Sequence, residues 1–182
     1  SMTFPDDYFT LENYIVHAMD DANKGLVITK TDHLFVNEAP YTLGIQRGID
    51  AASANWTVNV NDGTYPESPN VNKSLVLKSA NGRDATTIQL QPTGTTSYKS
   101  LFIDAANVTV DGFTIEGFDE ASGIAGCTNI ALTTNFADAS ILNNRILVGT
   151  STGYDLGLGI LNYSTTGDRT LLVDNNLILP VS

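Results

Sequence analysis

The carboxylate side chains are the residues of this chain that could most directly do chemistry. A polysaccharide hydrolase needs a carboxylic acid and a carboxylate base, and a lyase needs a base beside a cation. Asp111 and Asp174 occupy equivalent positions two units apart in a repeated pattern. If each repeat adds one strand spacing, these carboxylates lie roughly 10 Å apart, which is wide for a retaining pair and marginal for an inverting pair. We therefore predict no catalytic residue, although an enzyme remains an alternative.

A ligand-binding set is predicted around the same repeats. Arg145 is the cation of the middle repeats, and it is expected either to pair with a neighbouring Asp at the surface or to bind a uronate. The irregular segments 91–99 and 149–159 carry tyrosines that could stack on sugar rings, and loops on a rigid scaffold often carry binding residues. The predicted ligand-binding residues are Tyr98, Asp111, Asn144, Arg145 and Tyr154, and the predicted partner is a polysaccharide or other glycan.

Metal binding is a weaker hypothesis. Glu116, Asp119 and Glu120 lie close together after an expected strand and could hold Ca²⁺ with loop carbonyl groups. No Asp-x-Asp-x-Asp loop is present, so we expect no cofactor, with Ca²⁺ as the alternative. The two histidines, His17 and His33, both precede the repeats, where a catalytic histidine would be needed.

The composition excludes some partners. The formal net charge is −11, with 20 acidic and 9 basic side chains, and such a surface repels phosphate backbones. We therefore expect no nucleic-acid partner. No apolar run approaches the ~20 residues of a membrane span. Acidity of this kind suits an extracellular or cell-surface protein. The leading Ser1-Met2 resembles an expression scar, and we expect that a native targeting segment is absent from this sequence.

A short pattern that recurs every 31 to 33 residues must position these side chains. Placing Leu77, Val110, Leu142 and Val173 in register gives steps of 33, 32 and 31 residues, a period typical of a solenoid. Each repeat continues into Asp or Asn residues, which tolerate left-handed backbone and suit tight corners. Stacked corner amides are predicted to hydrogen-bond from one repeat to the next. The corner pairs are Asp111-Gly112, Asn143-Asn144 and Asp174-Asn175.

Two regions are predicted along the chain, an N-terminal cap over 1–42 and a repeat region over 43–182. Helical spacing predicts helices over 6–24 and 43–53. Short strands are expected over 26–29 and 33–36 about a Lys30-Thr31-Asp32 turn, and a further strand over 56–60. The apolar run Leu177–Ser182 has no cap, so we expect either that the solenoid continues beyond it or that this end pairs with another molecule.

The repeat region resembles the pectin-lyase-like superfamily from residue 45 to about residue 178. Residues 45–53, 57–67 and 71–79 read IQRGIDAAS, TVNVNDGTYPE and VNKSLVLKS, which are similar to that superfamily's first coil, and 107–115 reads NVTVDGFTI, which is similar to its repeat. The resemblance implies an all-β fold, a right-handed parallel β-helix of about four to five coils with an N-terminal α-helical cap. Gly48 stands within the helix expected over 43–53, where Ala is usual in the superfamily.

The superfamily includes polysaccharide lyases, hydrolases and non-catalytic surface domains, so the fold alone does not select an activity. We expect a non-catalytic module of a secreted or cell-surface protein with a structural or glycan-binding role. One alternative is the N-terminal portion of a polysaccharide lyase or hydrolase that acts on an acidic polysaccharide. Another is an assembly domain that self-associates through its C-terminal coil.

Overall fold

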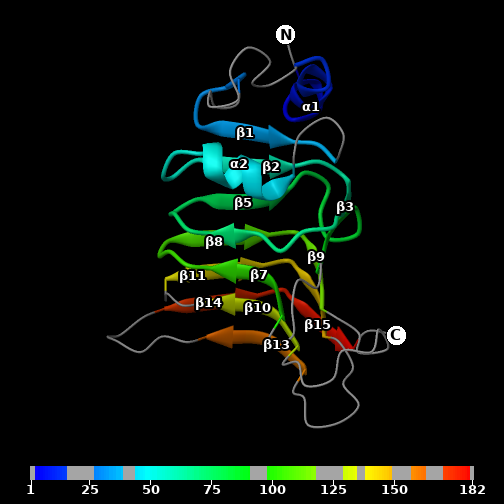
Figure 1. Ribbon diagram of the computed structural model, residues 1–182, viewed down its shortest axis with the longest axis vertical. Helices are drawn as coiled ribbons and strands as arrows, with labels where there is room; N and C mark the ends of the chain where they lie inside the picture. The colour runs from blue at the N-terminus through cyan, green and yellow to red at the C-terminus, as the bar shows by residue number, and fades with distance from the viewer. Residues whose placement is uncertain are drawn as a thin grey trace.

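The computed structural model describes residues 3–15, 27–38, 44–90, 98–117, 129–134, 138–148, 157–162 and 170–180. Within these ranges there are two helices and fifteen strands (Figure 1). The strands form three sheets, and every pairing within them is parallel.

The six-stranded sheet forms one side of the molecule, and its strands follow one another in chain order along the stack. Its members are β1 (His33–Val36), β2 (Thr57–Val60), β5 (Val76–Ser79), β8 (Val108–Asp111), β11 (Ala139–Leu142) and β14 (Leu171–Asp174).

Two further sheets contain the strands that follow each strand of the six-stranded sheet along the chain. One such set of consecutive strands, with its connections, is called a pass. The five-stranded sheet contains β3 (Gly63–Tyr65), β6 (Thr86–Gln89), β9 (Thr114–Glu116), β12 (Arg145–Val148) and β15 (Leu177–Pro180). The four-stranded sheet contains β4 (Asn70–Val71), β7 (Tyr98–Ile103), β10 (Asn129–Thr134) and β13 (Gly157–Asn162).

The predicted fold class is wrong. We expected an all-β parallel β-helix, but the described strands lie in three separate sheets that do not close into one solenoid, and with the two helices the class is α/β-like. The sequence repeat indicates only the spacing of strands and corners. It does not indicate how the chain runs between one strand of the six-stranded sheet and the next. In the first pass the helix α2 (Ile45–Ala51) precedes β2, and β4 has only two residues, so the passes are unequal.

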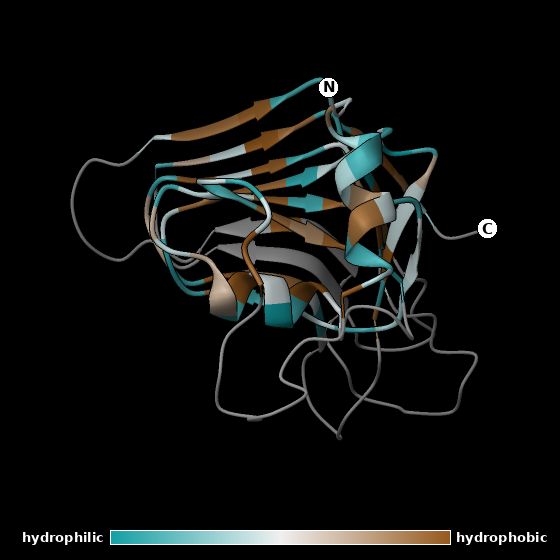
Figure 2. Cartoon of the chain, turned by 90° about the horizontal axis from the view of Figure 1, so that it is seen from above, coloured by the Kyte–Doolittle hydropathy of each residue, from teal (hydrophilic) through white to brown (hydrophobic). Residues whose placement is uncertain are grey.

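The core lies between the sheets, because alternate side chains of each strand point inward. Leu77, Val110 and Ile141 of the six-stranded sheet and Ile88 and Ile115 of the five-stranded sheet are fully buried in one apolar cluster. Figure 2 looks along the stack and shows hydrophobic segments on strands that surround this interior. Full burial of one such side chain contributes roughly 1.5–3 kcal/mol.

Of the four residues predicted to be in register, Leu77, Val110 and Val173 lie in one row and Leu142 does not, so only one of the three predicted steps is right. Leu77 pairs with Val110, as expected, but Val110 pairs with Ile141 and Ile141 pairs with Val173. Leu142, which we placed in this row, points away from the core and is half-buried. Adjacent apolar residues at 141 and 142 make the two registers equivalent in hydropathy, and only packing separates them.

The predicted left-handed corners are confirmed. Gly112, Asn143 and Asn175 have positive φ values of 83°, 57° and 51° where the chain leaves the six-stranded sheet. Asp32, Asn55, Asn107 and Asp138 have φ values of 56° to 68° where the chain enters it. Asp and Asn adopt this backbone more readily than other non-glycine residues, so the composition of the corners follows from their geometry.

Of the predicted helices and N-terminal strands, β1 is confirmed, and α2 confirms most of the helix expected over 43–53. The helix expected over 6–24 is confirmed as α1 (Asp6–Glu12) but is wrong over 13–15, where the chain leaves the helix through a turn. The strand expected over 26–29 is wrong where it is described, because Val27–Thr29 is irregular and Lys30 makes only an isolated bridge to His33. Val27 and Ile28 are half-exposed and gain no burial there. Residues 16–24, the rest of the expected first helix, lie outside the described residues, as does residue 26 of the expected strand.

Close packing of α2 against β1 and β2 explains why residue 48 is a glycine. A Cβ atom on this residue would lie 2.6 Å from Val36 Cγ2 and 3.1 Å from Val58 Cγ1, so α2 approaches β1 and β2 more closely than an alanine would allow. A mid-helix glycine costs about 1 kcal/mol relative to alanine. The close approach of the helix to the core offsets this cost.

Candidate functional site

A groove of about 430 Å³ lies where the six-stranded and five-stranded sheets meet. One wall is the connection between β5 and β6, residues 80–85. The other wall consists of residues at the end of the six-stranded sheet, namely Lys78, Ser79, Asp111, Gly112, Asn143 and Asn175.

The groove exists because this connection is longer than its counterparts. Six residues join β5 to β6, whereas only Gly112 and Phe113 join β8 to β9. The longer segment folds back over the Gly112 corner, where a Cβ atom would lie 3.3 Å from Gly82 Cα. Gly112 therefore combines a positive φ with a close backbone approach, which only glycine allows at this corner.

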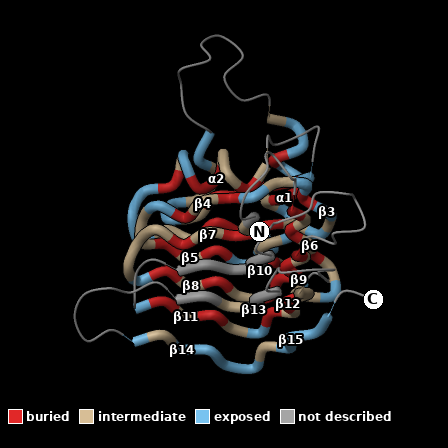
Figure 3. Tube along the Cα trace, turned by 60° about the horizontal axis from the view of Figure 1, so that its bottom comes forward, coloured by how far each residue is buried: buried red, intermediate tan, exposed pale blue. Residues whose placement is uncertain are grey.

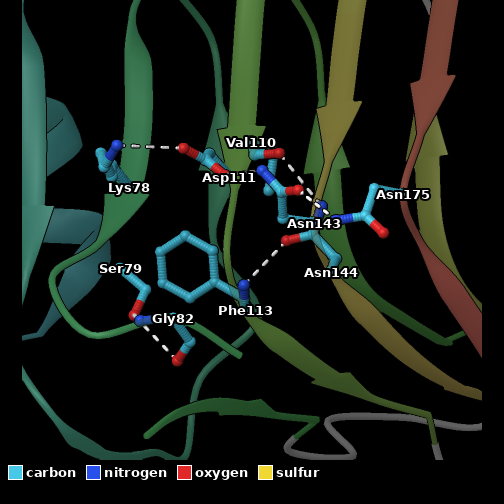
Figure 4. A network of polar contacts seen from close by, with 9 residues as sticks. All are labelled: Lys78, Ser79, Gly82, Val110, Asp111, Phe113, Asn143, Asn144 and Asn175. Carbon is cyan, nitrogen blue, oxygen red and sulfur yellow. Dashed lines mark hydrogen bonds and ion pairs between the residues drawn. The ribbon is translucent and has the colours of Figure 1, made fainter. Parts of the chain in front are cut away.

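Hydrogen bonds hold the 80–85 connection in place. Gly82 N donates to Ser79 Oγ at 3.0 Å, and Ser79 Oγ donates to Gly82 O at 3.2 Å, the bond drawn in Figure 4. Arg83 reaches along the stack and donates from Nη1 to Asn175 O at 2.8 Å, and Thr114 Oγ1 donates to Arg83 O at 2.6 Å. Arg83 Nη1 also donates to Asn144 O at 3.4 Å, so the wall is attached to each of the three passes that follow it.

A continuous row of polar side chains forms the other wall (Figure 4). Lys78 Nζ lies 3.2 Å from Asp111 Oδ2, and Asn143 Nδ2 donates to Asp111 Oδ1 at 2.7 Å. Asn175 Nδ2 donates to Asn143 Oδ1, also at 2.7 Å. The predicted ladder of corner amides is confirmed, and it fixes the orientation of the groups that face the groove.

A second, interior row contains Asn144, one residue further along each corner. Asn144 is fully buried, and its Oδ1 accepts from Phe113 N at 2.8 Å. Its Nδ2 donates to Val110 O at 3.0 Å and to Asn176 Oδ1 at 3.1 Å. The Asn144 side chain is therefore engaged in hydrogen bonds within the protein, and it satisfies buried backbone groups.

Arg145 lies beside the groove, on β12. Its Nη2 forms an ion pair with Asp84 Oδ1, and its Nη1 donates to Thr114 Oγ1 at 3.4 Å. The interpretation of Arg145 as a surface arginine paired with an Asp is confirmed. Asp84 is mostly exposed, so this pair contributes little to stability.

The other predicted ligand-binding residues are not brought to the groove by the described structure. Tyr98 begins β7 in the four-stranded sheet, and its side chain lies outside what the structure describes. Tyr154 also lies outside the described residues.

Of the three residues of the predicted metal site, only Glu116 belongs to the described part of the chain. Glu116 Oε2 accepts from Gln89 Nε2 at 3.1 Å, whereas Asp119 and Glu120 lie outside the described residues. Within the described ranges, no group of three or more His, Cys, Asp or Glu side chains is arranged to hold a metal ion. A Ca²⁺ site at Glu116, Asp119 and Glu120 stays a prediction.

The hypothetical catalytic pair is placed as the repeat indicated. Asp111 and Asp174 both pair with Leu142, so they lie two strand spacings apart, about 10 Å. The residue that lies between them in the register is Leu142. Asp111 faces the groove and Asp174 does not line it.

Sequence reasoning missed Asn81, Arg83 and Asp84, which line the groove from the 80–85 connection. The available signal was length, because this connection interrupts the two-residue corner pattern of the later repeats. An excursion at one corner of an otherwise regular repeat is where a binding loop is expected.

Comparison with known protein families finds no family model that matches this chain, and no curated protein matches it. The resemblance to the pectin-lyase-like superfamily stays a prediction. In the ranges that the structure describes, no helix has the length and apolar character needed to cross a membrane.

Proposed function

We propose that the protein is a non-catalytic module that binds a glycan in the groove between the 80–85 connection and the Lys78–Asp111–Asn143–Asn175 row. The row supports this proposal most strongly, because it presents carboxylate and amide groups in fixed orientations beside an open groove of about 430 Å³. Sugar hydroxyls both donate and accept, and carboxylates and amides match both roles. The groove also falls within the size range of small-molecule sites.

The charges beside the groove suit binding better than proton transfer. Asp111 accepts from Lys78 and Asn143, and Asp84 accepts from Arg145, so both carboxylates have fixed cationic neighbours. A general acid or base must instead exchange a proton with the substrate. The polysaccharide lyase or hydrolase alternative is tested by incubating acidic polysaccharides with the protein and Ca²⁺ and assaying for new reducing ends and ultraviolet-absorbing unsaturated products.

The binding proposal is tested by titrating neutral and acidic oligosaccharides into the protein in a calorimeter. Asn143→Gly removes the central amide of the row but retains a residue that tolerates its φ of 57°. We expect this variant to bind about tenfold more weakly, because about 1.4 kcal/mol corresponds to a factor of ten and one lost hydrogen bond is of that size.

Asn107→Gly is the matched control. Asn107 is an exposed asparagine with a φ of 56° at a corner that does not line the groove. We expect this variant to bind like the original protein. Equal losses in both variants, or no binding of any oligosaccharide by the original protein, would contradict the proposal.

Self-association through β14 and β15 is a second candidate function, and an exposed apolar surface favours it (Figure 3). Five apolar side chains of these strands are 38–50 % exposed, namely Leu172, Val173, Leu177, Ile178 and Leu179. The proposed occupant is a second copy of this chain. Asp174 is the one charged residue among residues 170–180, so pairing two copies there brings few like charges together despite the net charge of −11.

Sedimentation velocity over a range of concentrations tests this candidate. We expect a dimer, and we expect Ile178→Lys to make it monomeric because a charge would be buried at the contact. Val27→Lys changes a similarly exposed apolar residue in the N-terminal region and should leave the dimer intact. A strict monomer at high concentration would exclude this function.

A further inference from the structure

His33 lies in an aromatic cluster at the N-terminal end of the stack. It begins β1, the first strand of the six-stranded sheet. Its ring meets Phe4 edge-on at a centroid distance of 5.2 Å and stacks near Phe35 at 6.3 Å. The ring is therefore partly buried against the aromatic side chains of Phe4 and Phe35.

The hydrogen bonds of Asn59 define the protonation of His33. Asn59 on β2 is only 5 % exposed, and its Nδ2 donates to Leu34 O at 3.1 Å. The same Nδ2 lies 3.1 Å from His33 Nδ1. An amide nitrogen donates and does not accept, so His33 Nδ1 must be the acceptor and the ring proton must lie on Nε2.

Few charges act on this ring. Among the described residues, Lys30 and Asp32 of the preceding turn are the charged groups that influence it. Burial, followed by the nearby Lys30 cation, lowers the pKa of His33, and Asp32 opposes them. Asn59, which faces the ring from β2, is uncharged, and Tyr8 of α1 lies against Phe35 instead.

The same cluster attaches α1 to β1. Tyr8 stacks on Phe35 at a centroid distance of 4.9 Å, and Phe9 meets Phe35 edge-on at 5.3 Å. Asn37, which follows β1, donates from Nδ2 to Phe9 O at 3.0 Å. A change at His33 thus acts directly on the side chains that hold the helix over the first strand.

We propose that His33 is a pH-sensitive contact that releases α1 and the preceding residues from β1 when its Nδ1 takes up a proton from solvent. Protonation replaces an acceptor by a donor that points at the donor group of Asn59, so the hydrogen bond between them is lost. It also places a positive charge in an apolar cluster beside Lys30. Release would uncover the free edge of β1, which could then pair with another strand.

The direction of the pH effect follows from the lowered pKa of His33. The folded state favours the neutral ring, so the contact is complete above the ordinary value of 6.5 and weakens as the pH falls below it. Each pH unit between 6.5 and the folded pKa should reduce the protection of the affected amides about tenfold, since one proton is taken up on release.

Hydrogen exchange on the whole protein between pH 7.5 and pH 5, corrected for the intrinsic rate, tests the proposal. We expect amides of α1 and β1 to lose protection at the acid end while amides of β8 and β11 keep theirs. His33→Phe keeps an aromatic ring but cannot take up the proton, so its protection should not change with pH. His17→Phe replaces the other histidine of the chain and should keep the original pH dependence.

Two results would overturn the proposal. One is the same loss of protection in His33→Phe. The other, which requires no variant, is a nitrogen NMR shift showing that His33 Nδ1 carries the proton at pH 7.5. The second measurement decides the matter even if His33→Phe does not fold.

Discussion

The two ends of the stack differ in how their strand edges are covered. At the N-terminal end, α1 packs on β1, the Glu38 carboxylate accepts from Thr64 N of β3 at 3.3 Å, and Gln46 contacts β4. At the C-terminal end, every residue of β15 and three of the four residues of β14 are exposed (Figure 3). A repeat produces the same edge at each pass, so covering an edge requires residues that do not belong to the repeat.

Gln46 shows how a side chain can take the place of a strand. Its Oε1 accepts from Asn70 N at 2.6 Å, and its Nε2 donates to Asn70 O at 3.3 Å. The side-chain amide thus pairs with β4 as the peptide group of a neighbouring strand would. The helix that carries Gln46 is itself held by Glu67, which accepts from Ile45 N at 2.6 Å and Gln46 N at 2.9 Å.

The largest expected effect is that of Phe35→Ala. Phe35 is 2 % exposed and contacts the rings of Phe4, Tyr8 and Phe9. Its removal should lower the free energy of unfolding by about 3–5 kcal/mol, the usual cost of deleting a buried aromatic side chain. Urea unfolding measures this change, and a loss below about 1 kcal/mol would mean that the N-terminal cap contributes little to stability.

Gln46→Ala should have an intermediate effect. It leaves the backbone N–H of Asn70 without its acceptor, and an unsatisfied polar group of this kind costs about 1–3 kcal/mol. Gln89→Ala is the control, because Gln89 donates to the Glu116 side chain and not to a strand edge. Equal losses in the two variants would show that edge pairing is not what makes Gln46 important.

Ile178→Ala should have the smallest effect on the folding of a single chain. Ile178 is 50 % exposed on β15, and substitutions at such sites usually change the free energy of unfolding by about 0.5 kcal/mol or less. Unfolding at low protein concentration measures the single chain. A loss comparable to that of Phe35→Ala would show that the two ends are equally well packed.

Part of the fold was predictable from the sequence. The β2, β8 and β11 strands and the corners at Asn143 and Asn175 follow from local patterns, because turn residues and alternating apolar residues act over a few positions. The fold class was not predictable in this way. It depends on how α2 and the two-residue β4 complete the first pass, which is a matter of packing between distant segments.

The candidate site was predictable only in part, and the corner at 143–144 shows why. The sequence by itself determined that Asn143 and Asn144 form a corner with a side-chain ladder, since both suit left-handed or hydrogen-bonded turns. Only the tertiary structure decided that Asn143 faces the groove while Asn144 is buried against Val110 and Phe113. A shift of one residue reverses inside and outside in a strand, and the packing of neighbouring passes selects between them. The same packing laid the 80–85 connection over Gly112 and formed the groove.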